Sequence, residues 1–111
     1  MPAAAVRPDP YASDEDWAAA GIPLPGPKSD YRVTAVEAVN DRVLHVTHRD
    51  GVQGYVRFSP SAFRGPFDPL ADPALFKRVH VEYGAVVWSD EIDLAPDNMH
   101  RHLFAFGEWV L

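Results

Sequence analysis

The sequence contains no cysteine, which excludes disulfides, thiolate-bound zinc, iron–sulfur clusters and a thiol nucleophile. It also lacks an apolar run of about 18 residues and an apolar N-terminal segment behind a basic start, so we expect neither a membrane span nor a signal peptide. A reducing cytoplasm is the simplest compartment for such a chain. Its 111 residues are enough for one domain with a single core.

Basic side chains are also scarce, with 10 Lys and Arg against 16 Asp and Glu, for a net charge of −6. Residues 1–31 carry two basic and five acidic side chains. Residues 32–89 carry seven basic and six acidic side chains, and residues 90–111 carry one basic and five acidic side chains. A nucleic-acid binder needs a basic face, so acidic ends on a near-neutral body argue against that partner. A basic protein partner fits this distribution, and solvated acidic ends are the alternative explanation.

Proline is concentrated at one end, because six of the 11 prolines lie within the first 27 residues. We therefore divide the chain into a proline-rich arm, residues 1–30, and one α+β domain, residues 31–111, with an aromatic C-terminal tail. Within the arm, Ser13 as a cap and the acids after it predict a short helix that ends at Gly21.

The remainder alternates between strand and turn signals. Three strands are predicted over residues 31–39, 43–48 and 53–58, and Asp50-Gly51 between the last two is typical of a tight I′-type turn. A second hairpin covers residues 79–89 and is interrupted at Tyr83-Gly84. The prediction is an antiparallel sheet of about five short strands, a meander plus this hairpin.

Short helices complete the predicted α+β fold. Ser59-Pro60 and Asp72-Pro73 each place a capping side chain before a proline, which predicts two helical turns. A C-terminal helix is expected to begin at Pro96 and to end near Gly107.

Four motifs in succession, "HRDG", "SPSAFRGPFDPLADPALF", "VHVEYGAVVW" and "EIDLAPDNMH", resemble the bacterial family called domain of unknown function 2442 over roughly residues 31–102. The sequence departs from that pattern at His48, Arg57 and Ser89, where Phe, Asp and Pro are usual. The resemblance implies an antiparallel sheet backed by helices. It also implies an antitoxin-like or other partner-binding role, because members are often encoded beside small toxin-like proteins. Some relatives add a helix-turn-helix, for which this sequence leaves no segment, so direct nucleic-acid binding is not expected.

Acids and histidines gather around the predicted last helix, at Asp93, Asp97, His100 and His102. Two residues apart on a helix, His100 and His102 point about 200° from each other and cannot share one metal ion. Trp88, Ile92 and Leu94 fit a core, and Asp93 or Ala95 is expected near the start of the last helix, where a carboxylate can cap it. We therefore predict no metal, no cofactor and no catalytic residue. The alternative is a small enzyme or ligand binder that uses Asp93, Asp97 and His100.

His48 has two interpretations: a core histidine hydrogen-bonded to the backbone, or a pH-sensitive contact on an interaction face. On the strand, His45 is expected to face the opposite side from His48.

The terminal extensions are rich in aromatic side chains that a core of this size does not obviously need. Either they pack across the sheet of this chain or they form an interface with another chain. We predict a protein-binding module, antitoxin-like or a small accessory subunit of a larger complex, with self-association as a further option. The predicted partner-binding residues are Tyr11, Trp17, Ile22, Leu24, Phe104, Phe106 and Trp109.

Overall fold

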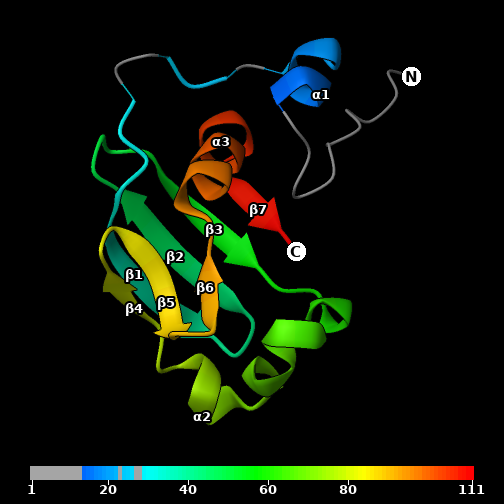
Figure 1. Ribbon diagram of the computed structural model, residues 1–111, viewed down its shortest axis with the longest axis vertical. Coiled ribbons are helices and arrows are strands. Elements are labelled where there is room, and N and C mark those ends of the chain that lie inside the picture. Colours follow the sequence, from blue (N-terminus) through cyan, green and yellow to red (C-terminus); the bar gives the residue numbers. More distant parts are fainter. Residues whose placement is uncertain (1–13, 23, 27–28) are drawn as a thin grey trace.

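The computed structural model describes residues 14–22, 24–26 and 29–111, and in this part of the chain two β-sheets and the last helix surround one core (Figure 1). The α+β class and the C-terminal helix agree with the sequence prediction, but there are seven strands in two sheets rather than about five in one. Within the described residues, no helix combines the length and apolar character that crossing a membrane requires. The elements are α1 (Asp14–Ala19), β1 (Val33–Asn40), β2 (Val43–His48), β3 (Gln53–Arg57), η1 (Pro60–Ala62), η2 (Gly65–Ala71), α2 (Pro73–Phe76), β4 (His80–Glu82), β5 (Ala85–Ser89), β6 (Ile92–Leu94), α3 (Pro96–Phe106) and β7 (Glu108–Val110).

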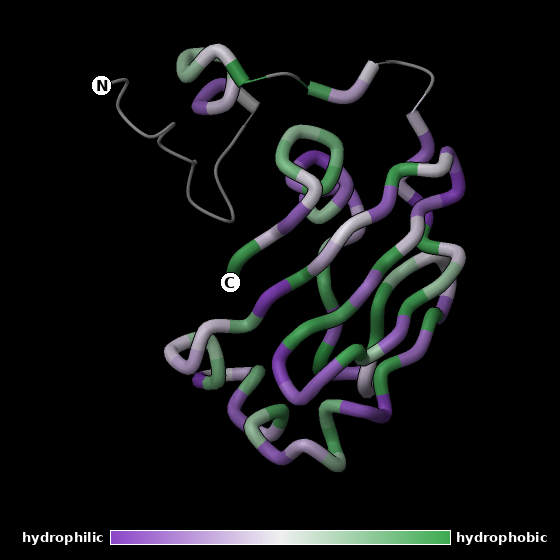
Figure 2. Tube along the Cα trace, turned by 180° about the vertical axis from the view of Figure 1, so that it is seen from behind, coloured by the Kyte–Doolittle hydropathy of each residue, from purple (hydrophilic) through white to green (hydrophobic). Residues whose placement is uncertain are grey.

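The larger sheet has the order β1-β2-β3-β7. Its first three strands form the predicted antiparallel meander, whereas β7 pairs in parallel with β3. Burial alternates along β2, where Leu44, Val46 and His48 are buried between half-buried neighbours. Figure 2 shows hydrophobic and hydrophilic residues interspersed along the strands. One face of the sheet therefore lies on the core, as period-two patterning requires.

The smaller sheet has the order β4-β5-β6 and is antiparallel throughout. Val86, Trp88 and Leu94 bury its inner face against the core. The strand β6 was not predicted, because its three residues lie among acids that resemble a loop. A bond from the Val33 N–H to the Gly84 carbonyl (2.8 Å) ties β1 to the turn of the second hairpin.

The prediction of an I′-type turn at Asp50-Gly51 was wrong in its geometry. Gly51 has φ +94°, but Asp50 is not left-handed, and the Gly51 N–H bonds the His48 carbonyl at 3.0 Å. This is the pattern of a longer hairpin loop with glycine at a bulge. The two-residue loop with positive φ at both positions lies in the second hairpin, at Tyr83 (φ 51°) and Gly84 (φ 76°).

The helical turns predicted to start at Ser59-Pro60 and Asp72-Pro73 are both present, as η1 and α2, with the additional 3-10 segment η2 between them. Asp72 caps α2 by accepting a hydrogen bond from the Ala74 N–H at 2.9 Å. The buried ring of Phe76 packs edge-to-face on Phe58 at 5.4 Å. Its carbonyl accepts the Trp88 Nε1–H at 2.8 Å, which joins this helical region to β5.

The last helix, α3, begins at Pro96 and stops where Gly107 adopts a left-handed conformation, as its terminal residues predict. The Gly107 carbonyl then accepts the Tyr55 N–H at 3.1 Å and starts the pairing of β7 with β3. Gly54 lies directly beneath: a Cβ there would overlap the Gly107 carbonyl oxygen. The C-terminal tail is therefore part of the larger sheet.

Candidate functional site

Two of the predicted partner-binding tryptophans lie inside this chain. Trp17 is 0% exposed and Trp109 is 1% exposed. The ring of His102 lies close to both, at 4.7 Å from Trp17 and 5.3 Å from Trp109. The two tryptophans therefore pack on this chain rather than at an interface with another chain, and neither has exposed surface for a partner.

The other predicted residues divide by exposure. Leu24 and Phe104 are exposed, at 38% and 46%. Ile22 and Phe106 are partly buried, and the ring of Phe106 lies 5.8 Å from Trp17. Tyr11 lies outside the described residues.

The Asp93, Asp97 and His100 group does not come together. Asp97 and His100 line one hollow of about 270 Å³, beside Arg101 and the arm residues Leu24 and Pro25. Asp93 lies on β6 and lines a different hollow. Of the two residues expected near the start of the last helix, Ala95 is the N-cap and Asp93 is not. Ala95 makes no side-chain cap bond, and the Asp97 carboxylate accepts the Asn98 N–H at 2.9 Å. Arg101 donates to the Asn98 side chain at 2.6 Å.

His100 instead meets residues of the first hairpin. Its Nε2 lies 2.7 Å from Asp50 Oδ2, and its ring lies edge-to-face on His48 with centroids 4.8 Å apart. His48 donates from Nδ1 to the Tyr31 carbonyl at 2.6 Å, which is the hydrogen-bonded core histidine that the sequence allowed. Asp50 Oδ2 also accepts the Asp30 N–H at 3.1 Å. The two histidines and Asp50 thus fasten the start of the domain to α3 and to the β2–β3 turn.

Burial and hydrogen bonding shift the protonation of this cluster. Burial lowers the pKa of His48 below its usual value, against the opposing effect of its bond to the Tyr31 carbonyl. Burial alone would raise the pKa of Asp50, but bonds from the Val52 N–H, from His100 and from the Asp30 N–H together hold it below its ordinary value.

No group of three or more potential metal ligands lies together within the described part of the chain. His45 faces away from His48, on the outer side of β2 beside Tyr55, at 5.2 Å between ring centroids. His102 bonds the Asn98 carbonyl through Nδ1 at 2.9 Å and packs among aromatic rings. Both histidines thus make contacts with other residues of this chain.

The second hairpin carries an unusual residue at its tip. Tyr83 is 100% exposed and has φ 51°, a conformation that is rare for a bulky residue. Two-residue loops of this type favour Asn-Gly or Asp-Gly, because short polar residues and glycine tolerate positive φ. The tyrosine therefore stabilises neither the core nor the turn. The Tyr-Gly interruption was visible in the sequence, but nothing there distinguished it from an ordinary turn.

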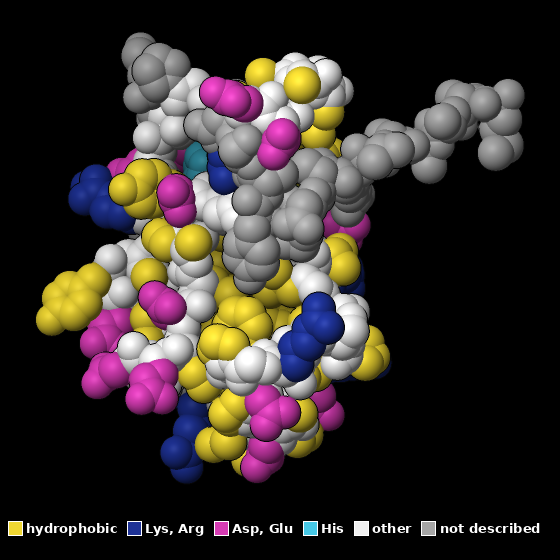
Figure 3. All heavy atoms as spheres, turned by 45° about the vertical axis from the view of Figure 1, so that its right-hand side comes forward, with side chains coloured by type: hydrophobic (Ala, Val, Ile, Leu, Met, Phe, Trp, Pro, Cys, Tyr) yellow, Lys and Arg dark blue, Asp and Glu magenta, His cyan; other side chains and the backbone are white. Residues whose placement is uncertain are grey.

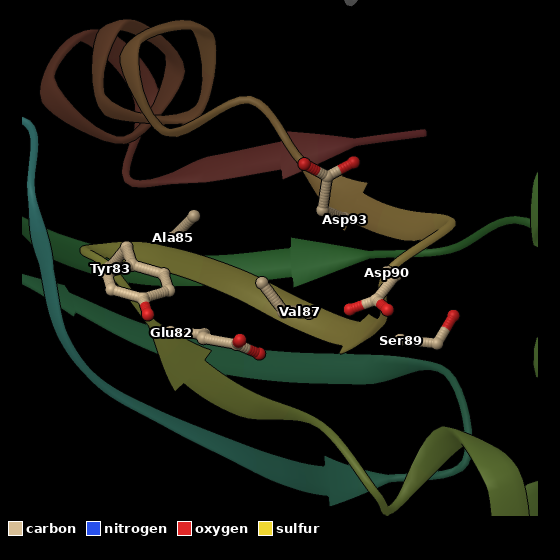
Figure 4. A pocket seen from close by; sticks show the side chains of 7 residues that line it. All are labelled: Glu82, Tyr83, Ala85, Val87, Ser89, Asp90 and Asp93. Carbon is tan, nitrogen blue, oxygen red and sulfur yellow. The ribbon is translucent and has the colours of Figure 1, made fainter.

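Beside Tyr83, the outer face of the smaller sheet forms a hollow of about 270 Å³. Val87 and Ala85 of β5 give it an apolar floor, and carboxylates stand around Val87 (Figure 4). Figure 3 shows acidic side chains beside apolar ones on one face of the molecule. We call this site the acidic hollow. Its lining residues are Glu82, Tyr83, Ala85, Val87, Ser89, Asp90 and Asp93.

The model of a family described as a protein of unknown function (DUF2442) matches residues 33–105. The chain belongs to this family. The match covers both sheets except β7, and it includes the acidic hollow and the His48–Asp50–His100 cluster. No curated protein and no solved structure matches the chain.

Proposed function

We propose that this chain is a protein-binding module, acting as an antitoxin-like protein or as a small accessory subunit of a larger complex. The observation that carries the proposal is Tyr83, an aromatic side chain that is fully exposed in a backbone conformation unfavourable to it. A strained residue persists where the surrounding structure imposes it, and such residues cluster at functional sites. Tyrosine is also among the side chains enriched at protein interfaces.

The surroundings of Tyr83 support this proposal. The acidic hollow lies next to it and combines apolar floor residues with charged rim residues, as a small docking site does. Leu24 and Phe104 are a second candidate surface. They belong to the terminal residues predicted to bind a partner and, unlike Trp17 and Trp109, they are exposed.

The alternative, an enzyme or ligand binder that uses Asp93, Asp97 and His100, has less support. Asp93 lines a different hollow from the other two residues. The Nε2 atom of His100 already bonds Asp50, so a reaction at that atom would first break a contact that holds α3 to the hairpin.

The test is capture of proteins from a lysate of the source organism by the immobilised full chain. Three forms are compared: wild type, Tyr83→Asn, and a Leu24→Ser/Phe104→Ser double variant. We expect a protein retained at stoichiometric amounts by wild type and by the double variant, and lost with Tyr83→Asn. If all three forms retain the same proteins, or none retains any, the proposal is wrong.

A further inference from the structure

We infer that the acidic hollow receives an arginine side chain carried by the partner protein. This inference rests on the proposed function and names the chemistry of the partner at the same site. The charge, the apolar floor and the aromatic edge of the hollow each favour this occupant.

The charge of the hollow favours a cation. Glu82, Asp90 and Asp93 line it, and none of its lining residues is basic. The nearby bases have other partners: His80 lies 3.2 Å from Glu82, and Arg32 bonds Asp30 through both Nε and Nη2, at 3.0 and 2.7 Å. Because His80 can neutralise Glu82 when it is protonated, Asp90 and Asp93 supply the charge that remains for a partner.

The floor of the hollow favours a cation on a long apolar stem. Val87 lies at the centre, with Ala85 beside it and the carboxylates around them (Figure 4). A small hydrated ion would leave these apolar surfaces in contact with water. Arginine and lysine side chains bury their methylene stems on apolar surface while the charged end stays polar, so both match this arrangement.

Arginine fits better than lysine. Its planar guanidinium can donate to two carboxylates at once and stacks on aromatic rings, whereas the lysine ammonium is a compact, strongly hydrated charge. The ring of Tyr83 lies at the rim beside Glu82, at the opposite end of the hollow from Asp90 and Asp93 (Figure 4), so it can flank the stem of an arginine whose guanidinium bonds these two carboxylates. The hollow of about 270 Å³ is of a size for one long side chain rather than for a folded segment.

The test uses the full chain and three capped pentapeptides, Gly-Val-Arg-Val-Gly, its lysine form and its citrulline form, in an NMR titration of backbone amides. Citrulline keeps the shape of arginine and removes its charge. We expect the arginine peptide to shift amides of β4–β6 and to bind about tenfold more tightly than the citrulline peptide, with lysine between them. Equal binding of the arginine and citrulline peptides, or shifts confined to other elements, would overturn the inference.

Variants of the hollow complete the test. Asp90→Asn/Asp93→Asn is expected to lower the affinity for the arginine peptide about tenfold, whereas Glu37→Gln, an exposed carboxylate of the larger sheet, should leave it unchanged. An equal loss with both variants would indicate general attraction to an acidic protein and would overturn the inference. If Tyr83→Asn abolishes capture of the natural partner but Asp90→Asn/Asp93→Asn does not weaken it, the arginine inference fails while the proposed function stands.

Discussion

His100 Nε2 lies 2.7 Å from Asp50 Oδ2, a contact that bonds the last helix to the turn between β2 and β3. The two residues are 50 positions apart in the chain, and His48, two residues before Asp50, lies against the same imidazole at 4.8 Å. The imidazoles of His48 and His100 are buried at this contact, and His48 also bonds the Tyr31 carbonyl. The stability of the fold depends on the protonation of His48 and Asp50.

We predict that stability falls on acidification in two stages. Burial lowers the pKa of His48, so below about pH 6.5 the unfolded chain binds a proton more readily than the folded chain, and stability decreases until the folded-state pKa is passed. The pKa of Asp50 is also lowered, so its contribution is complete above about pH 3.9 and is lost as the pH falls further. Denaturant unfolding measured between pH 3 and pH 8 checks both stages.

The matched variants separate His48 from the other histidines. His48→Asn keeps a donor near the Tyr31 carbonyl but does not titrate, so it should flatten the stability curve just below about pH 6.5. His45→Asn, on the opposite face of the same strand, should leave the slope as in wild type. An unaltered slope in His48→Asn would show that another group controls the first stage.

A second prediction concerns the docking of the C-terminal strand. Gly54→Ala places a methyl group against the Gly107 carbonyl oxygen, and the backbone there cannot move without breaking the Tyr55-to-Gly107 bond. We expect a loss of roughly 1–3 kcal/mol or more in the free energy of unfolding. Gln53→Ala, the exposed neighbour on β3, is the control and should change stability by less than about 0.5 kcal/mol. Equal stability of the two variants would mean that β7 is not closely docked.

Gly51 gives a different kind of prediction. Its φ is +94°, and a Cβ there would meet no atom within 4 Å, so only backbone strain opposes a side chain. Gly51→Val should therefore destabilise the protein by roughly 1 kcal/mol or more. An unchanged midpoint in thermal unfolding would count against the left-handed geometry of this turn.

Local signals account for the parts of the fold that the sequence predicted. Proline at the first position and glycine after the last define α3, and alternating apolar residues define β2 and β3, because each signal acts within a few residues. The strands β6 and β7 have three residues each and exist through pairing with β5 and β3. Nothing local distinguishes them from loops.

The candidate sites depended on longer-range information. His48, Asp50 and His100 were each noticed in the sequence, but their meeting requires α3 to cross the β2–β3 turn. The acidic hollow joins residues of β4, β5 and β6 with the loops between them, so it is defined only when the second sheet is formed. The aromatic residues of the termini predicted a partner-binding surface, but Trp17 and Trp109 are buried within this chain.

The burial of these tryptophans changes the effect expected of their removal. Trp109→Ala removes a fully buried side chain of the core and should cost roughly 3–5 kcal/mol. Trp17→Ala removes the contact of α1 with His102 and Phe106 and should detach α1 at a cost of about 1.5–3 kcal/mol without unfolding the sheets. Hydrogen exchange should show lost protection in α1 alone for Trp17→Ala and throughout the domain for Trp109→Ala. Identical exchange patterns would contradict this division.

The last prediction separates stability from binding at one residue. Tyr83 occupies the first position of a two-residue loop with positive φ, where asparagine is strongly favoured, and its fully exposed side chain contributes no burial. Tyr83→Asn should therefore leave the free energy of unfolding unchanged or raise it by a few tenths to about 1 kcal/mol. Gly84→Ala is the contrasting variant, because it adds a Cβ at φ 76° that would lie 3.1 Å from the Arg32 side chain. It should destabilise the same hairpin, and thermal unfolding measures both. A Tyr83→Asn protein that is more stable than wild type but no longer retains its partner would show that Tyr83 serves binding and lowers the stability of the turn. A clear loss of stability would instead make Tyr83 a structural residue and remove the main support for the proposed binding face.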